Sequence, residues 1–305
     1  MRVVRLSFTM LLTFLCVVLC GCTTRSDEQS LPPVATAEKP VVEMPASLPA
    51  EVVARYDLSA LEQEGVFASL DRTRLLTTLD DPAYRSGPRT FVGYDLQQLL
   101  DKLDGFNQYE STSHSLRFVC KDGYRTTFDF SSIQGARGLV AVSLQGGEWD
   151  TYAHGKKSLT PDPFYLVWEN EPISKKRPWP YQLTAIEIVS KDAIAARITP
   201  PEEGFAKGAE TYKQYCMACH SMNLSGGEMG PELNVPMNIC EYRNRNYVKQ
   251  FIKQPQSFRA RSTMPAMAHL DDAVIDRVVD YICAMKSKKL CVSVTDCGEK
   301  LIAGQ

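Results

Sequence analysis

The sequence predicts two folded domains of different class, a mixed α+β domain over residues 51–197 and an all-α domain over residues 201–290. In the first region, hydrophobic and polar residues alternate in several short runs, which is typical of strands. In the second region, hydrophobic residues recur at helical spacing, most clearly over residues 272–286. Between the two, Thr199-Pro200-Pro201-Glu202-Glu203-Gly204 is a run that ends one element and begins a helix.

The composition suits a soluble, packed protein that does not bind nucleic acid. The chain has 305 residues, of which 44% are hydrophobic, and a formal net charge of −2. A chain of this length can bury the cores of two domains, and the charge gives no sign of a nucleic acid partner. Ten cysteines are too few for a disulfide scaffold of this length.

Residues 1–21 are predicted to be a signal peptide. Arg2 and Arg5 form the positively charged n-region of a signal peptide, and the apolar run Leu6–Leu19 that follows them is its h-region. A membrane-spanning helix needs about 20 apolar residues, and here polar residues follow directly after Cys22. Residues 22–50 are polar and then rich in proline, so we expect a lipidated N-terminus and an extended tether.

The run Leu19-Cys20-Gly21-Cys22 resembles the lipobox of bacterial lipoproteins. This resemblance implies that Cys22 becomes the first residue of the mature protein and carries acyl chains on the periplasmic side of a bacterial membrane. Several acyl chains hold a protein on a membrane durably. Thr23 stands where an aspartate would, in some bacteria, signal retention at the inner membrane, so the resemblance favours the outer membrane.

In the first domain, leucines at helical spacing predict a helix over residues 94–103. Two alternating runs, residues 116–120 and 124–130, flank Asp122-Gly123 and predict a β-hairpin. Further strands are expected over residues 138–144, 164–168 and 183–189. Cys120 shares a strand face with Leu116 and Phe118, which predicts a buried, unreactive thiol.

The second domain is expected to contain helices over residues 204–216 and 272–286. Between Tyr242 and Leu270 there is no acidic residue, whereas six cations occur: Arg243, Arg245, Lys249, Lys253, Arg259 and Arg261. Two interpretations stay open. The cations form a basic rim that steers an acidic redox partner, or they belong to a solvated helix face.

Cys216-Met217-Ala218-Cys219-His220 has the C-x-x-C-H spacing that is the signature of haem c attachment. Cysteines three residues apart lie on one face of a helix and reach the two vinyl groups of one porphyrin, and His220 then points at the iron. The alternatives are a redox dithiol and half of a zinc site. A thioredoxin-like dithiol would open a helix after a strand, and zinc would need a second pair of ligands nearby. We therefore prefer one covalent haem c.

The residues around this motif resemble class I c-type cytochromes over the whole second domain. The resemblance rests on Gly208 and Tyr212 before the motif, and on Gly230-Pro231-Glu232-Leu233, Met264-Pro265 and Val278-Val279-Asp280-Tyr281-Ile282 after it. It implies that the Pro231 carbonyl orients His220 and that the first and last helices cross at Gly208 and Tyr281.

The same resemblance implies that Met264 is the sixth iron ligand, opposite His220. Met267 is the second candidate, and His269 is expected to be a surface residue. A histidine–methionine pair raises the reduction potential and suits electron transfer. Because both axial positions would be filled, we expect an electron carrier rather than an enzyme.

The first domain resembles, more loosely, the molybdopterin-binding fold of the sulfite-oxidase type. The features are Phe91-x-Gly93, Asp122-Gly123-Tyr124, Gly138-Leu139-Val140-Ala141, Phe164-Tyr165-Leu166-Val167 and Trp179. The resemblance implies an alternative function, a haem-containing molybdenum-cofactor oxidoreductase or its cytochrome subunit. No phosphate anchors can be assigned and the domain is short, so we expect it to be free of cofactor.

The remaining cysteines can form disulfides in an oxidising periplasm. Cys240 can reach Cys283 on the last helix, and Cys291 can pair with Cys297 in the C-terminal tail, residues 291–305. The spacing alone does not decide these pairings.

Overall fold

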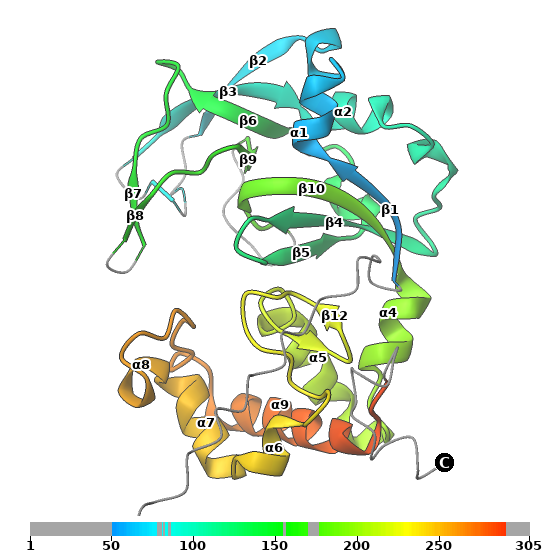
Figure 1. Cartoon of the computed structure of the whole chain (residues 1–305), viewed down its shortest axis with the longest axis vertical. Helices are drawn as coiled ribbons and strands as arrows, with labels where there is room; N and C mark the ends of the chain where they lie inside the picture. Colours follow the sequence, from blue (N-terminus) through cyan, green and yellow to red (C-terminus); the bar gives the residue numbers. More distant parts are fainter. Residues whose placement is uncertain are drawn as a thin grey trace, which may run out of the picture. The chain divides into compact units, whose positions relative to one another are not determined.

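The computed structural model describes residues 51–77, 81, 83–84, 87–154, 157–169 and 177–290. The predicted signal peptide, Cys22 with the tether that follows it, and the tail with Cys291 and Cys297 lie outside these residues. All described residues belong to one compact unit. Residues 51–190, called here the sheet region, are rich in strands, and residues 191–290, the helical region, are mostly helices (Figure 1). The predicted change of class along the chain is confirmed.

Eight antiparallel strands form the main sheet, in the order β2-β3-β6-β9-β10-β4-β5, with β1 paired to β10. Their bounds are β1 Val52–Asp57, β2 Arg72–Thr77, β3 Arg89–Asp95, β4 His114–Cys120, β5 Arg125–Phe128, β6 Gly138–Leu144, β9 Phe164–Trp168 and β10 Tyr181–Ser190. A small hairpin consists of β7 Tyr152–His154 and β8 Lys157–Leu159. Strand β10 pairs with β9 near its start and with β4 and β1 along the rest of its length.

The strands β6 and β9 have the bounds that the sequence predicts, and β4 and β5 form the predicted hairpin. Gly123 in its turn has φ +87°, a conformation that glycine adopts without strain. The predicted helix over residues 94–103 is shorter than expected. Tyr94 and Asp95 end β3, and the Asp95 side chain accepts a hydrogen bond from the Gln98 N–H, so the helix begins at Leu96.

The helices are α1 Leu58–Gln63, α2 Leu96–Lys102, α3 Phe130–Ile133, α4 Lys191–Ile198, α5 Ala206–Tyr215, α6 Ile239–Tyr242, α7 Arg245–Lys253, α8 Pro255–Phe258 and α9 Asp272–Ala284. Helices α5 and α9 correspond to the two predicted in the second domain. Helix α5 begins two residues later and ends one residue earlier than predicted, whereas α9 begins at the predicted residue and ends two residues earlier. The helical region also holds a two-residue ladder, β11 Ser221–Met222 with β12 Ser225–Gly226. None of the described helices is long and apolar enough to span a membrane.

Helices α5 and α9 cross in close contact at Gly208. A Cβ atom on Gly208 would lie 2.3 Å from the Arg277 carbonyl oxygen and 2.6 Å from Tyr281 Cβ, so only glycine fits there. Beside the crossing, the rings of Tyr212 and Tyr281 lie 5.5 Å apart between centroids. The crossing that the cytochrome resemblance implied is therefore present.

Each region has its own core. In the sheet region, Leu116, Phe118 and Cys120 of β4 are all buried, as their shared strand face predicts. The Phe118 ring packs edge-on against Phe128 at 5.1 Å. In the helical region, the core includes Tyr212, Tyr281 and Ile198, and Ile198 brings the end of α4 into it.

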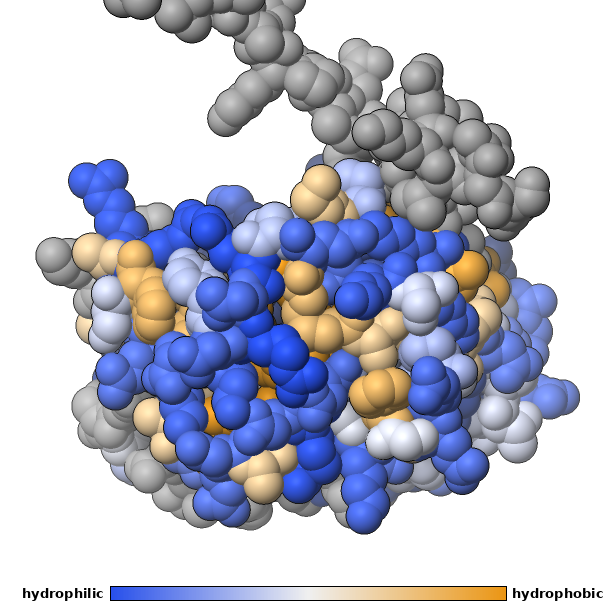
Figure 2. All heavy atoms as spheres, turned by 90° about the horizontal axis from the view of Figure 1, so that it is seen from below, coloured by the Kyte–Doolittle hydropathy of each residue, from blue (hydrophilic) through white to orange (hydrophobic). Residues whose placement is uncertain are grey.

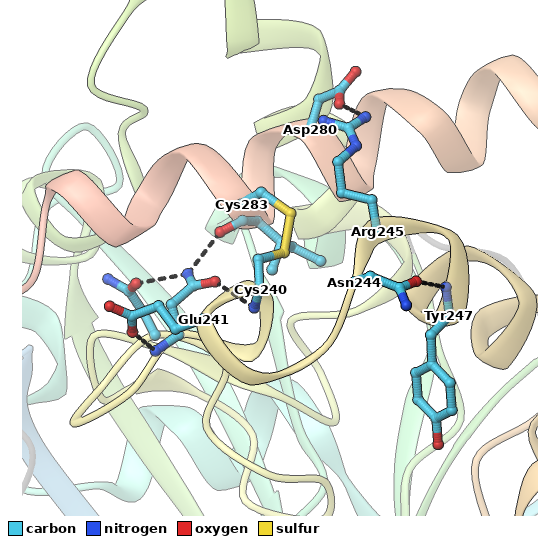
Figure 3. The surroundings of a disulfide bond; sticks show 10 residues. Cys240, Glu241, Asn244, Arg245, Tyr247, Asp280 and Cys283 are labelled. Carbon is cyan, nitrogen blue, oxygen red and sulfur yellow. Dashed lines mark hydrogen bonds and ion pairs between the residues drawn. A yellow bond between two sulfur atoms is a disulfide. The ribbon is translucent and has the colours of Figure 1, made fainter.

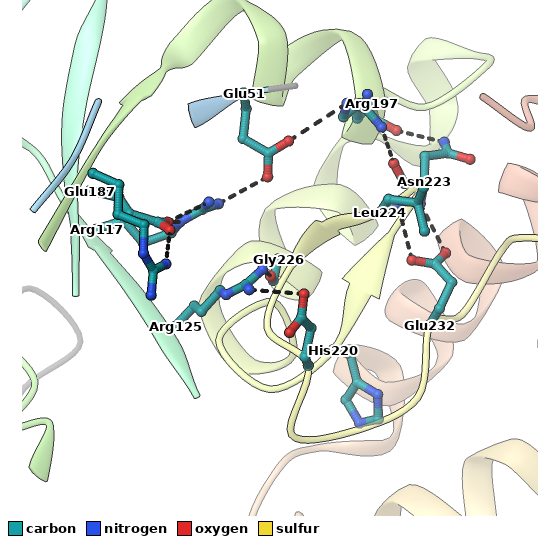
Figure 4. Close-up of polar contacts among 12 residues, drawn as sticks. Glu51, Arg117, Arg125, Glu187, Arg197, His220, Asn223, Leu224, Gly226 and Glu232 are labelled. Atoms are coloured by element: carbon teal, nitrogen blue, oxygen red, sulfur yellow. Dashed lines mark hydrogen bonds and ion pairs between the residues drawn. The ribbon is translucent and has the colours of Figure 1, made fainter. Parts of the chain in front are cut away.

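The opposite face of β4, which carries Arg117, is buried too. Arg117 is 1% exposed and Glu51 and Glu187 are fully buried (Figure 4). The Arg117 guanidinium donates to Glu187 at 2.8 Å and to Glu51 at 2.9 Å. Arg55 adds an ion pair to Glu187, and Arg197 of α4 lies 3.7 Å from Glu51. Since β4 is an inner strand, its charged residues are paired inside the molecule.

Candidate functional site

The motif turn, residues 216–220, follows directly from the end of α5. Cys216 is the residue at which α5 ends, and its N–H donates to the Tyr212 carbonyl at 2.8 Å. One turn later the His220 N–H donates to the Cys216 carbonyl, also at 2.8 Å. This helical turn brings Cys216 and Cys219 to one side, and both are free, half-buried thiols.

His220 is held by groups from the loop that follows. Its Nδ1 atom lies 2.8 Å from the Pro231 carbonyl oxygen. Because a carbonyl only accepts, Nδ1 carries the proton and Nε2 keeps a free lone pair. A Cβ atom on Gly230 would lie 2.4 Å from His220 Cε1, so glycine is required for the ring to sit there. The contact with Pro231, implied by the cytochrome resemblance, is thus present.

Burial sets the protonation of this turn. It raises the pKa of Cys216 to about 12 and that of Cys219 to about 11, and it lowers the pKa of His220. At neutral pH both thiols are therefore protonated and the imidazole is neutral. Redox dithiols have a thiol with a lowered pKa, so this environment does not favour the dithiol interpretation. Among the described residues no three His, Cys, Asp or Glu side chains group as metal ligands.

Buried amides and Glu232 shape the loop after the motif. The Glu232 carboxylate accepts from the N–H groups of Asn223 and Leu224, both at 2.9 Å (Figure 4). Asn223, Asn234 and Asn238 are fully buried, and each is hydrogen-bonded to the next at 2.8 Å. Sequence reasoning missed this chain of asparagines. The only feature of the sequence that could have pointed to these asparagines is that they lie close to the Gly230–Leu233 run along the chain.

Met264 and Met267 lie in the loop between α8 and α9, and both are half-buried. The Met264 carbonyl accepts from Gln256 Nε2 at 2.8 Å, and the Met267 N–H donates to the Ile252 carbonyl at 3.1 Å. The loop is therefore held through its backbone, and neither side chain is hydrogen-bonded to another residue that the structure describes. Exposure does not distinguish the two methionines, whereas His269 is exposed, as expected.

A disulfide joins Cys240 of α6 to Cys283 of α9 (Figure 3). It links positions 43 residues apart, with 5.3 Å between their Cα atoms. The structure thus selects this pairing, which the sequence had left open. Next to it, Asn238 and Glu241 form a capping box at the start of α6.

Three of the six cations between Tyr242 and Leu270 are paired with acidic residues of α9. Arg245 with Asp280, Lys249 with Asp276 and Lys253 with Asp272 form a ladder of ion pairs between α7 and α9. Arg243 instead lies over the rings of Tyr242 and Tyr247. Seen from the side of α6, α7 and α9, the surface is mostly hydrophilic, with small hydrophobic groups (Figure 2). The ladder favours a solvated helix face over a continuous basic rim.

The turn of the β4–β5 hairpin contacts the motif turn directly. The Arg125 N–H donates to the Ala218 carbonyl at 2.9 Å, and the Glu228 N–H donates to the Gly123 carbonyl at 2.8 Å. Arg125 and Glu228 also form an ion pair of 2.8 Å. The sheet region therefore holds the motif turn and its following loop by backbone and side-chain contacts.

A helical region with crossing end helices, a C-x-x-C-H turn and a carbonyl-oriented histidine defines a c-type cytochrome domain. In agreement, a family model described as cytochrome c oxidase, cbb3-type, subunit III matches residues 203–282. Its match covers most of the helical region and none of the sheet region. No curated protein matches the chain. The helical region is therefore a cytochrome c domain, which implies haem c as cofactor and electron transfer as its activity.

Proposed function

We propose that the protein is a lipid-anchored periplasmic electron carrier with one covalent haem c. Cys216 and Cys219 form thioethers with the porphyrin, and His220 and Met264 are the axial ligands. The observation that carries the proposal is the contact of His220 Nδ1 with the Pro231 carbonyl, which leaves Nε2 free for iron. The neutral imidazole and the two thiols of the same turn fit the group well.

When bound, haem supplies reversible one-electron exchange. The protein's own residues orient and enclose it. The packing of Gly230 and the hydrogen bond to Pro231 fix the plane of the His220 ring. The hydroxyl of Tyr212 donates to the His220 carbonyl at 2.8 Å and thereby ties the end of the motif turn to α5. A methionine sulfur as the second axial ligand favours the reduced state.

The sheet region supports a carrier more than a molybdenum enzyme. Burial, and after it the charge of Asp122, raises the pKa of Cys120 well above its usual value. A molybdenum ligand would have to be the thiolate, which requires an accessible, electropositive setting. The Cys240–Cys283 disulfide suits an oxidising compartment and so supports the proposed periplasmic location.

We expect the haem to stay with the protein after acid–acetone extraction, because thioether bonds survive acid whereas axial bonds do not. The protein should be made in a host with a haem-maturation system. A Cys216→Ala, Cys219→Ala double variant should lose essentially all bound haem under the same treatment, measured from the pyridine haemochrome spectrum. Haem that is extracted from the unchanged protein would contradict covalent attachment.

For the anchor, Cys22→Ser should abolish labelling by a fatty-acid analogue and leave the protein as a precursor or in the soluble periplasmic fraction. Cys20→Ser is the matched control, since it leaves the proposed acylation site unchanged. Gel-shift and membrane fractionation measure both results. Undiminished labelling of the Cys22→Ser variant would place the lipid elsewhere.

A further inference from the structure

The carboxylate of Glu232 is fixed next to the residue that orients His220. Its described hydrogen-bond partners are all backbone N–H groups, those of Asn223, Leu224, Asn234 and Val235. Oε1 accepts three of these bonds, at 2.9 to 3.2 Å, and Oε2 accepts the fourth, at 2.9 Å (Figure 4 shows two of them). Glu232 directly follows Pro231, whose carbonyl oxygen lies 2.8 Å from His220 Nδ1. The loop after the motif turn therefore holds a carboxylate close to the proposed iron ligand.

No cation among the described residues pairs with the Glu232 carboxylate. The other two glutamates of this stretch each have one. Glu228 forms an ion pair with Arg125, and Glu241 forms one with Lys289 at 2.7 Å. Backbone N–H groups hold a carboxylate in place but leave its net charge unchanged. Glu232 is half-buried, so water screens its charge less than that of an exposed side chain.

The charge of Glu232 acts on the imidazole of His220. Burial lowers the pKa of His220, whereas the hydrogen bond to Pro231 and the charge of Glu232 act in the opposite direction. A negative charge that favours a positive charge on the ring also favours a positive charge on a metal bound to the ring. Iron carries one more positive charge in the ferric than in the ferrous state. The carboxylate therefore favours the oxidised state.

We propose that Glu232 tunes the haem site: it lowers the reduction potential of the iron that His220 binds, through its charge and without touching the iron. The proposal rests on the proposed function in one respect, the binding of haem iron by His220. A methionine ligand raises the potential, so Glu232 opposes Met264. The potential of this protein is then a balance between an axial ligand and a carboxylate of the neighbouring loop.

Potentiometric titration of the full haem-loaded protein tests the proposal with two variants that separate charge from geometry. Glu232→Gln removes the charge, but its amide oxygen can still accept from the three N–H groups that bind Oε1. Its potential should rise. Glu232→Asp keeps the charge on a shorter side chain, which weakens the hydrogen bonds. Its potential should stay closer to that of the unchanged protein than the potential of Glu232→Gln does.

Glu228→Gln is the matched control, because it removes a carboxylate from the same loop. The Glu228 side chain is 43% exposed, so water screens its charge and the potential should rise less than in Glu232→Gln. The visible and near-infrared spectra of every variant show whether it has bound haem with unchanged axial ligands.

An unchanged potential of Glu232→Gln, with intact spectra, overturns this proposal and leaves the proposed function standing. A rise in Glu232→Asp as large as in Glu232→Gln also overturns it, because the geometry of the loop and not the charge would then set the potential. If Glu232→Asp binds no haem, the comparison with Glu228→Gln decides, and equal rises in the two glutamine variants overturn the proposal. Haem that is extracted from the unchanged protein would instead contradict the proposed function.

Discussion

Replacing Arg117 with leucine should lower the free energy of unfolding by about 3 kcal/mol, at the lower end of what breaking a buried ion pair costs. The substitution leaves Glu51 and Glu187 buried without their shared partner. Arg55 and Arg197 still contact these carboxylates, which keeps the loss from being larger. Denaturant unfolding of the haem-loaded protein, followed by circular dichroism, measures the change.

Arg137→Leu is the matched control for this experiment. Arg137 also pairs with a glutamate, Glu169, at 2.7 Å, but its side chain is 57% exposed. Exposed ion pairs contribute about 0–1 kcal/mol. If the two variants lose the same amount of stability, burial of the Arg117 cluster contributes nothing, and our account of the sheet region is wrong.

Replacing Met264 with alanine should lower the reduction potential by on the order of 0.1–0.3 V, because axial ligands set haem potentials over a range of about 0.8 V. The near-infrared sulfur-to-iron band of the ferric protein should disappear. The loop itself should persist, since Met264 is tied to Gln256 through its backbone carbonyl, which alanine retains. Potentiometric titration and near-infrared spectroscopy of the purified protein measure both effects.

Met267→Ala is the matched control, because Met267 lies in the same loop, is equally half-buried and is also held through its backbone. It should keep both the band and the potential. If Met267→Ala removes the band and Met264→Ala does not, Met267 is the ligand and the proposed axial pair is wrong.

Local features of the fold could be predicted well from the sequence. The bounds of β6 and β9 follow from short apolar runs, and the β4–β5 turn follows from Asp122-Gly123. These patterns depend on neighbours along the chain. The start of α2 was missed by two residues, because Tyr94 and Asp95 pair with Val140 and Leu139 of β6 and so extend β3. Pairing between distant strands overrides the helical spacing there.

The charges could not be placed from the sequence. Alternation along β4 shows which residues share a face, but not whether one or both faces are covered, so it could not place Arg117 in the interior. Likewise, the stretch from Tyr242 to Leu270 has no acids of its own, and the carboxylates that pair with it come from α9. A count of charges along a segment does not include partners that folding brings from elsewhere.

The sequence by itself was enough to find the residues that meet at the candidate site. Cys216, Cys219 and His220 lie within one helical turn, and Pro231 follows 11 residues after His220. Their closeness in space therefore follows from their closeness along the chain. Only the tertiary structure decided what surrounds that turn. The Gly123 turn lies on the loop at Glu228, and Trp179 and Met229 line one cavity from opposite regions. Such contacts join residues about 50 to 100 positions apart, and they exist only after both cores have packed.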